Sequence, residues 1–152
     1  MLYSSRQLLG LNKKTLHQTR GGSVGTEIPS QGEPEDYDNG SPEQKLAEYL
    51  TLWKRKNYGY MANCLSEQLW PGRNMPARVR ELCESKALRS FRFLSVTDEA
   101  PAISIIETAL VIEEDDQTIE QVIPFRMFRD FEKNPESINP MGQWSVVNWN
   151  AI

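Results

Sequence analysis

One carboxylate in the sequence has the setting of a general base. Glu107 falls within an alternating apolar run, and the expected strand places it on one face with Ile103, Ile105, Ala109 and Val111. A carboxyl group buried among such neighbours has a raised pKa, because burial disfavours its charged form. A group of this kind could take a proton from a hydrophobic substrate.

The same carboxylate has a structural alternative. The opposite strand face, with Ile106, Leu110 and Ile112, is equally apolar, so Glu107 could instead face solvent, a partner or a cross-strand base. Arg126, on the next expected strand, is the expected ion-pair partner of Glu107. An ion pair of this type is more often structural than catalytic, and it is weak evidence for stability.

The other residues able to do chemistry are few. The only histidine is His17, which precedes the expected domain, and Cys64 and Cys83 lie in helical patterns beside apolar neighbours. We expect both cysteines to be buried free thiols, because small cores accommodate Cys well. With no CxxC pair and no histidine in the domain, the sequence predicts neither a metal site nor a Cys–His nucleophile, and no cofactor.

Composition narrows the class of protein. The net charge is -4 with both signs interspersed, whereas nucleic-acid-binding domains usually carry a basic stripe. No apolar run approaches the roughly 20 residues of a membrane-spanning helix. We therefore expect no nucleic-acid or membrane partner, and free thiols favour the reducing cytoplasm.

The N-terminal quarter reads as an arm rather than a domain. Residues 1–26 contain four basic residues and no acid, while 21–42 are dominated by Gly, Pro, Ser and acidic residues. Such a segment buries too little apolar surface to offset its ordering entropy. We expect residues 1–40 to be a flexible arm and linker that adds little stability, with organellar targeting by the arm as the alternative.

The folded domain is expected over residues 41–152. Ser41 suits a helix N-cap, Pro42 the first helical position, and Gln44 can reach back from the third. From Leu46 to Trp53, apolar residues recur at helical spacing. Two shorter helices are expected after it, over 58–65 and 76–85.

The pattern then changes to alternation. Strands are expected over 90–96, 102–114, 118–132 and 143–151, with Pro124 marking an edge or a bulge because proline cannot donate to a ladder. Short polar turns join them, which favours an antiparallel meander. The sequence predicts an α+β fold in which three N-terminal helices pack on a curved antiparallel four-stranded sheet.

Three segments resemble the nuclear transport factor two-like superfamily, whose members have a cone-shaped α+β fold. They are LAEYLTLWKRKNYGYMANCLSE, KALRSFRFLSV and the closing GQWSVVNWN. The resemblance covers roughly residues 42–152 and rests on pattern and element order. The short strand that the family often has between its second and third helices is not evident, and the loop at Leu69-Trp70-Pro71 could stand in its place.

The resemblance implies a pocket inside the cone. The aromatic residues available to line it share positions on the apolar faces of the expected elements, and they are Trp53, Tyr58, Phe91, Phe125, Trp144 and Trp149. Plain core packing is the alternative for all of them. Together with Glu107 and Arg126 they form the expected pocket or interface, and a small hydrophobic molecule is a possible ligand.

The long strands predict a partner as well. They are apolar on both faces, and the helices can cover only one. A large exposed apolar patch usually marks an interface. We expect a homodimer or an adjoining domain on the second face, and a non-enzymatic binding or assembly module. The alternative is a small isomerase or lyase acting on a hydrophobic substrate, with Glu107 as base.

Overall fold

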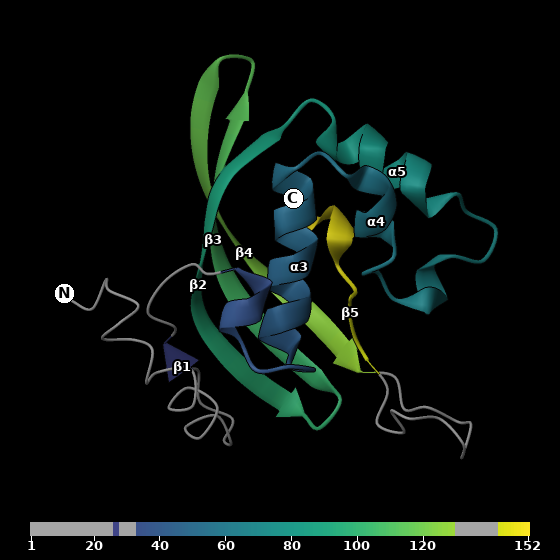
Figure 1. Cartoon of the computed structure of the whole chain (residues 1–152), viewed down its shortest axis with the longest axis vertical. Coiled ribbons are helices and arrows are strands. Elements are labelled where there is room, and N and C mark those ends of the chain that lie inside the picture. Colours follow the sequence, from purple (N-terminus) through teal and green to yellow (C-terminus); the bar gives the residue numbers. More distant parts are fainter. Residues whose placement is uncertain (1–25, 28–32, 130–142) are drawn as a thin grey trace.

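The computed structural model describes residues 26–27, 33–129 and 143–152 (Figure 1). The α-helices are α3 (Pro42–Lys54), α4 (Tyr58–Ala62) and α5 (Met75–Cys83). The strands are β1 (Thr26–Glu27), β2 (Ala87–Ala100), β3 (Ile103–Glu114), β4 (Gln117–Arg129) and β5 (Trp144–Val146). Short 3-10 turns are η1 (Pro34–Asp36), η2 (Glu67–Leu69) and η3 (Trp149–Ala151).

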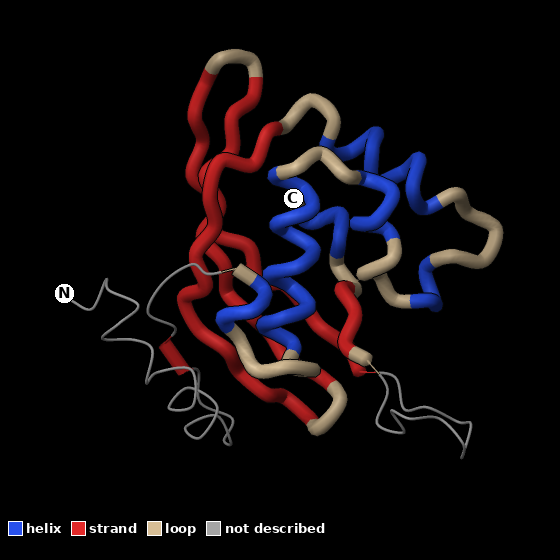
Figure 2. The backbone as a smooth tube through the Cα atoms, in the orientation of Figure 1, coloured by secondary structure: helices blue, strands red, loops and turns tan. Residues whose placement is uncertain are grey.

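The strands form one antiparallel sheet in the order β1-β2-β3-β4-β5. Figure 2 shows the strands as one layer and the helices gathered on one side of it. The predicted α+β class is confirmed, and the three α-helices precede the four antiparallel strands β2 to β5 as expected. The expected four-stranded sheet gains a fifth strand, because β1, within the expected arm, pairs with β2. In the described part of the chain, no helix is long and apolar enough to span a membrane.

Helix α3 begins where its capping residues stand. The Ser41 Oγ accepts a hydrogen bond from the Gln44 amide at 3.1 Å, and Pro42 occupies the first turn. The Gln44 side chain reaches back as expected, but its Oε1 accepts from the Gly40 amide at 2.8 Å rather than from Ser41. These bonds satisfy amides that a helix start otherwise leaves without partners.

The helices cover one face of the sheet. That face is buried on all three long strands, through Leu88, Phe91, Phe93, Val96, Ile106, Leu110, Ile112, Ile123, Phe125 and Met127. A register shift between Phe93 and Ser95 lets both Phe93 and Val96 turn inward despite their odd spacing. The core therefore lies between α3 and this side of the sheet.

The β3–β4 hairpin extends past the helices (Figure 1). Residues 117–122 are exposed on both faces of β4. Asp115 and Asp116 make the turn with φ values of 52° and 62°. Two left-handed residues in succession give the turn whose twist matches the paired strands.

Core packing extends to the N-terminal side of Ser41. Tyr37 is buried, and its ring centroid lies 5.3 Å from that of Phe93. The expected arm at residues 1–25 and 28–32 lies outside the described residues. Residues 33–40, expected as linker, are described, and Tyr37 among them contributes to the core.

The last strand is shorter than expected. It was predicted over 143–151, but pairing with β4 stops at Val146. Beyond it the Asn148 side chain takes over: its Nδ2 donates to Pro124 O at 2.8 Å, and its Oδ1 accepts from the Arg126 amide at 2.7 Å. Pro124 thus lies where one side of β4 has no neighbouring strand, which is the edge position predicted. Its missing N–H donor therefore interrupts no ladder on that side.

Replacing Asn148 with alanine should lower the free energy of unfolding by about 1–2 kcal/mol, because two hydrogen bonds to the β4 backbone are lost. Asn148→Asp should cost more, since it sets an oxygen against the carbonyl of Pro124. Urea unfolding measures both. The control Asn150→Ala removes an exposed neighbour and should change stability by less than about 0.5 kcal/mol. Equal losses for Asn148→Ala and Asn150→Ala would contradict the bridging role.

Candidate functional site

The predicted pocket aromatics are core residues. Trp53 and Phe125 are fully buried, and Tyr58, Phe91 and Trp144 are at most 9% exposed. They pack in the single cluster between helices and sheet, and they do not line the groove described below. For these five residues the structure favours the alternative of plain core packing.

Glu107 and Arg126 lie on the opposite side of the sheet and do not pair. Glu107 stands across from Pro124, whereas Arg126 stands across from Ile105. The Glu107 carboxylate instead accepts a hydrogen bond from Ser95 Oγ at 3.0 Å. Arg126 forms its ion pair with Glu99, at 3.3 Å. The expected Glu107–Arg126 pair was wrong, because the register of β4 on β3 is offset by two residues from the one that sets Arg126 opposite Glu107.

The setting of Glu107 also bears on the general-base hypothesis. Its side chain is exposed on the open face of β3. A general base of the expected kind requires burial among hydrocarbon, and Glu107 lacks that burial. Its neighbours Ile105 and Ala109 are only half-buried. Glu107 is therefore a surface carboxylate held by a serine.

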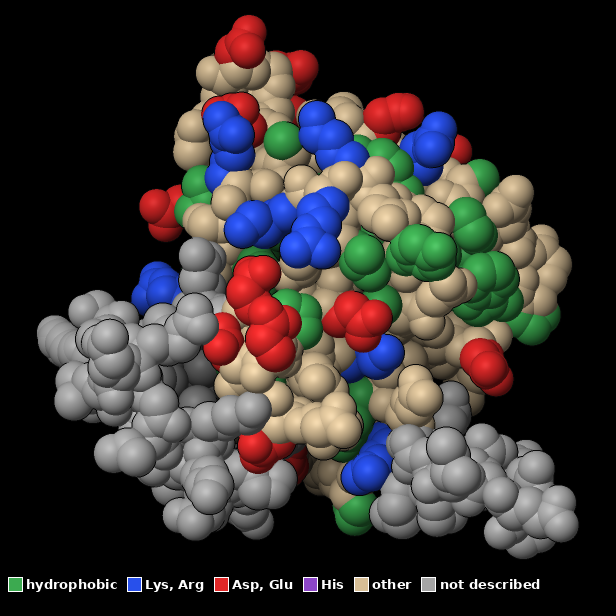
Figure 3. Space-filling view, viewed as in Figure 1, with side chains coloured by type: hydrophobic (Ala, Val, Ile, Leu, Met, Phe, Trp, Pro, Cys, Tyr) green, Lys and Arg blue, Asp and Glu red, His purple; other side chains and the backbone are tan. Residues whose placement is uncertain are grey.

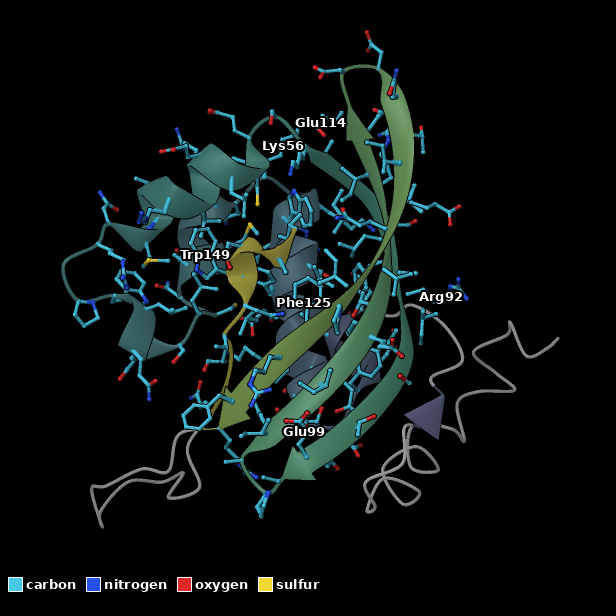
Figure 4. All side chains as sticks on the ribbon, turned by 180° about the vertical axis from the view of Figure 1, so that it is seen from behind. Lys56, Arg92, Glu99, Glu114, Phe125 and Trp149 are labelled. Atoms are coloured by element: carbon cyan, nitrogen blue, oxygen red, sulfur yellow. The ribbon has the colours of Figure 1, made fainter. Side chains whose placement is uncertain are left out.

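The face of the sheet that carries no helix is the first candidate site. We call it the helix-free face (Figure 4). Its apolar residues are half-buried or exposed on neighbouring strands, and they are Ile103, Ile105, Ala109, Val111, Val122 and Phe128. Val122, on the hairpin arm, is 56% exposed. The other set on β3, Ile106, Leu110 and Ile112, is the one beneath the helices.

Charges of both signs interrupt this face. Arg92 lies opposite Ala109, and Glu120 lies opposite Val111. Glu107 and the ion pair of Arg126 with Glu99 add further charges of both signs to this face. A surface with both signs can be complementary to a second copy of itself.

A groove on the helical side is the second candidate site. It encloses about 630 Å³ between α5, the connection that precedes α5, and the segment after β5. Its lining consists of Leu69, Arg73, Met75, Arg78, Glu81, Leu82, Val147, Trp149 and Asn150. Figure 3 shows apolar side chains gathered near α4 and its connection to α5, as seen from the side of Figure 1.

Of the predicted aromatics, only Trp149 lines this groove. The sequence did not reveal the other residues that line the groove, because it shows α5 as an ordinary amphipathic helix with solvated arginines. A signal was present in the spacing of Met75, Arg78 and Leu82, which puts an arginine on the same helix face as two apolar residues. Nothing in the sequence indicates that the segment after Trp144 returns to face α5.

The two buried thiols of the core are not activated nucleophiles. Burial raises the pKa of the Cys64 and Cys83 thiols to about 12, so both are protonated at neutral pH. Burial likewise raises the pKa of Tyr49 well above its ordinary value. Its hydroxyl, like the Thr51 hydroxyl, is buried and has no hydrogen-bond partner among the residues that the structure describes. Within the described ranges, no cluster of three or more His, Cys, Asp or Glu could hold a metal ion.

The sequence was compared with protein-family models and with curated proteins. No protein-family model matches the chain, and no curated protein matches it.

Proposed function

We propose that this chain is a non-enzymatic binding or assembly module that forms a homodimer through its helix-free face. The observation that carries the proposal is the row of half-buried and exposed apolar residues on β3 and β4. Each such residue left in water forfeits about 25 cal/mol for every Å² that could be buried. A symmetric dimer is the commonest way for a soluble chain to cover such a face.

We further propose that the fold is the cone-shaped one of the nuclear transport factor two-like superfamily. The element order supports this assignment, since three helices precede long antiparallel strands. Leu65 supports it too, because it bridges in parallel to Val146. The Ser66 amide donates to Val146 O at 3.0 Å, and the Val146 amide donates to Cys64 O at 2.8 Å. This short extended stretch lies between α4 and α5, where the family often has a strand.

The enzymatic alternative has less support. An isomerase or lyase of this fold would need a carboxylate inside a cavity, and Glu107 lies exposed and bonded to Ser95. An apolar face with both signs of charge suits recognition of a protein surface better than it suits proton transfer. A partner domain on the same face is the alternative to a second copy of this chain, and the following experiment distinguishes the two.

Val122→Lys should convert the dimer into a folded monomer. Val122 is 56% exposed, so a lysine costs the protomer little, yet in the dimer it would bury an unpaired charge. Sedimentation velocity at micromolar concentration measures the assembly, and circular dichroism checks folding.

The matched control is Ile119→Lys. Ile119 lies on the same strand and is 40% exposed, but it stands opposite Ile112 on the helical side of the sheet. This variant should remain dimeric. If Ile119→Lys dissociates the dimer and Val122→Lys does not, the interface lies on the other side of the hairpin. If the unmodified chain is a monomer, homodimerisation through this face is excluded.

A further inference from the structure

The groove beside α5 has two walls of different origin. One wall is a face of α5, on which Met75, Arg78 and Leu82 follow at helical spacing. The other wall is the segment after β5, with Val147 and Trp149. Figure 4 shows Trp149 on the side of the sheet where the helices lie. A volume of about 630 Å³ falls within the range of sites that enclose small molecules.

Both walls are held in place by other parts of the fold. The inner face of α5 is anchored by Val79 and Cys83, which are fully buried. The opposite segment is tied to β4, where the Val147 amide donates to Arg126 O at 2.9 Å. Lys86 fixes its far end, because its Nζ donates to Ile152 O at 3.3 Å. The groove is therefore formed before any ligand arrives, which lowers the ordering cost of binding.

The lining joins an apolar floor to a cationic rim. Met75 is fully buried, and Leu82 and Trp149 are half-buried. At the rim, Arg73 is pinned by a hydrogen bond from its Nη1 to Leu69 O at 3.1 Å. Arg78 is exposed and makes no ion pair within the part of the chain that the structure describes. Its guanidinium donors are available to a carboxylate.

The charges select among anions. Arg73, Arg78 and Glu81 give the lining a net charge of about +1 at neutral pH. A monoanion neutralises this charge, whereas a dianion such as a phosphate monoester would meet the Glu81 carboxylate as well. The half-buried indole of Trp149 and the Leu82 side chain offer contact area that a small inorganic ion cannot use.

We infer that this groove binds a small amphipathic monocarboxylate, with its apolar body against Leu82 and Trp149 and its carboxylate on Arg78. The site is separate from the helix-free face, and it requires no assembly. It therefore adds a ligand to the module proposed above.

Decanoate is the probe, and decan-1-ol is its uncharged counterpart. We expect decanoate to bind the full chain with a dissociation constant of about 1 mM or tighter. Two-dimensional NMR of the four tryptophan indole N–H groups reports the site. The Trp149 signal should shift, whereas the signal of Trp53, buried and bonded to Lys86 O, should not.

Two variants separate the carboxylate contact from general hydrophobic binding. Arg78→Gln should weaken decanoate binding about tenfold or more and leave decan-1-ol binding unchanged. Arg55→Gln removes an exposed arginine at the end of α3 and should leave both affinities unchanged. The inference is overturned if decanoate does not bind, if decan-1-ol binds as tightly as decanoate, or if Arg78→Gln and Arg55→Gln have equal effects.

Discussion

Replacing Trp53 with alanine should lower the free energy of unfolding by about 3–5 kcal/mol. Trp53 is fully buried at the end of the apolar stripe of α3. Its Nε1 also donates to Lys86 O at 2.9 Å, just before β2 begins. Truncation would leave a cavity in the core and an unpaired carbonyl beside it. Urea unfolding followed by circular dichroism measures the loss.

Trp53→Phe separates these two contributions. Phenylalanine keeps a ring in the core but cannot donate to Lys86, so it should cost about 1–2 kcal/mol. A loss below about 1 kcal/mol for Trp53→Ala would remove Trp53 from the core. Equal losses for the two variants would place the whole effect in the hydrogen bond.

Raising the pH from about 8 to about 10 should destabilise the protein by about 1.4 kcal/mol for each of its two thiols. Burial raises the pKa of Cys64 and Cys83 from 9.0 to about 12. Because the folded-state pKa lies above the unfolded value, the stabilisation is complete below about pH 9 and is lost as the pH rises toward 12. Urea unfolding at a series of pH values measures the slope.

The control is the double variant Cys64→Ala, Cys83→Ala. It starts less stable, but its stability should change little between about pH 8 and pH 10, because no thiol remains to titrate. Tyr49 has a raised pKa of the same sign and should contribute only at higher pH, since its ordinary value is 10.0. An unchanged pH dependence in the double variant would show that the thiols are not the titrating groups.

The elements were predictable wherever local chemistry determines them. Ser41 and Pro42 mark the start of α3, and the helix does begin there. The change to alternation before Phe91 marks the long strands, whose lengths follow from turns such as Asp115-Asp116. These features depend on residues close in sequence, so a single chain suffices to read them.

The contacts between distant segments were not predictable. The Glu107–Arg126 pairing depended on the register of β3 against β4, which is offset by two residues from the one required. Glu107 bonds to Ser95 instead, and Arg126 pairs with Glu99. A small change in register changes every cross-strand neighbour, and the residue pattern does not specify it to that accuracy.

The groove was missed for a related reason. Its two walls, α5 and the segment after β5, are more than sixty residues apart in sequence. Of the residues that line the groove, only Trp149 is among those expected to line a pocket, and it is expected within a strand. The end of β5 at Val146, with Asn148 bonded to the β4 backbone, directs Trp149 toward α5 instead.

The mass of the unmodified chain in solution tests homodimerisation directly. The protomer mass is 17.5 kDa, and static light scattering over a range of micromolar concentrations should give twice that value. The dimer follows from the uncovered apolar residues of β3 and β4, which a second copy would bury. A mass of 17.5 kDa at every concentration would contradict homodimerisation through the helix-free face.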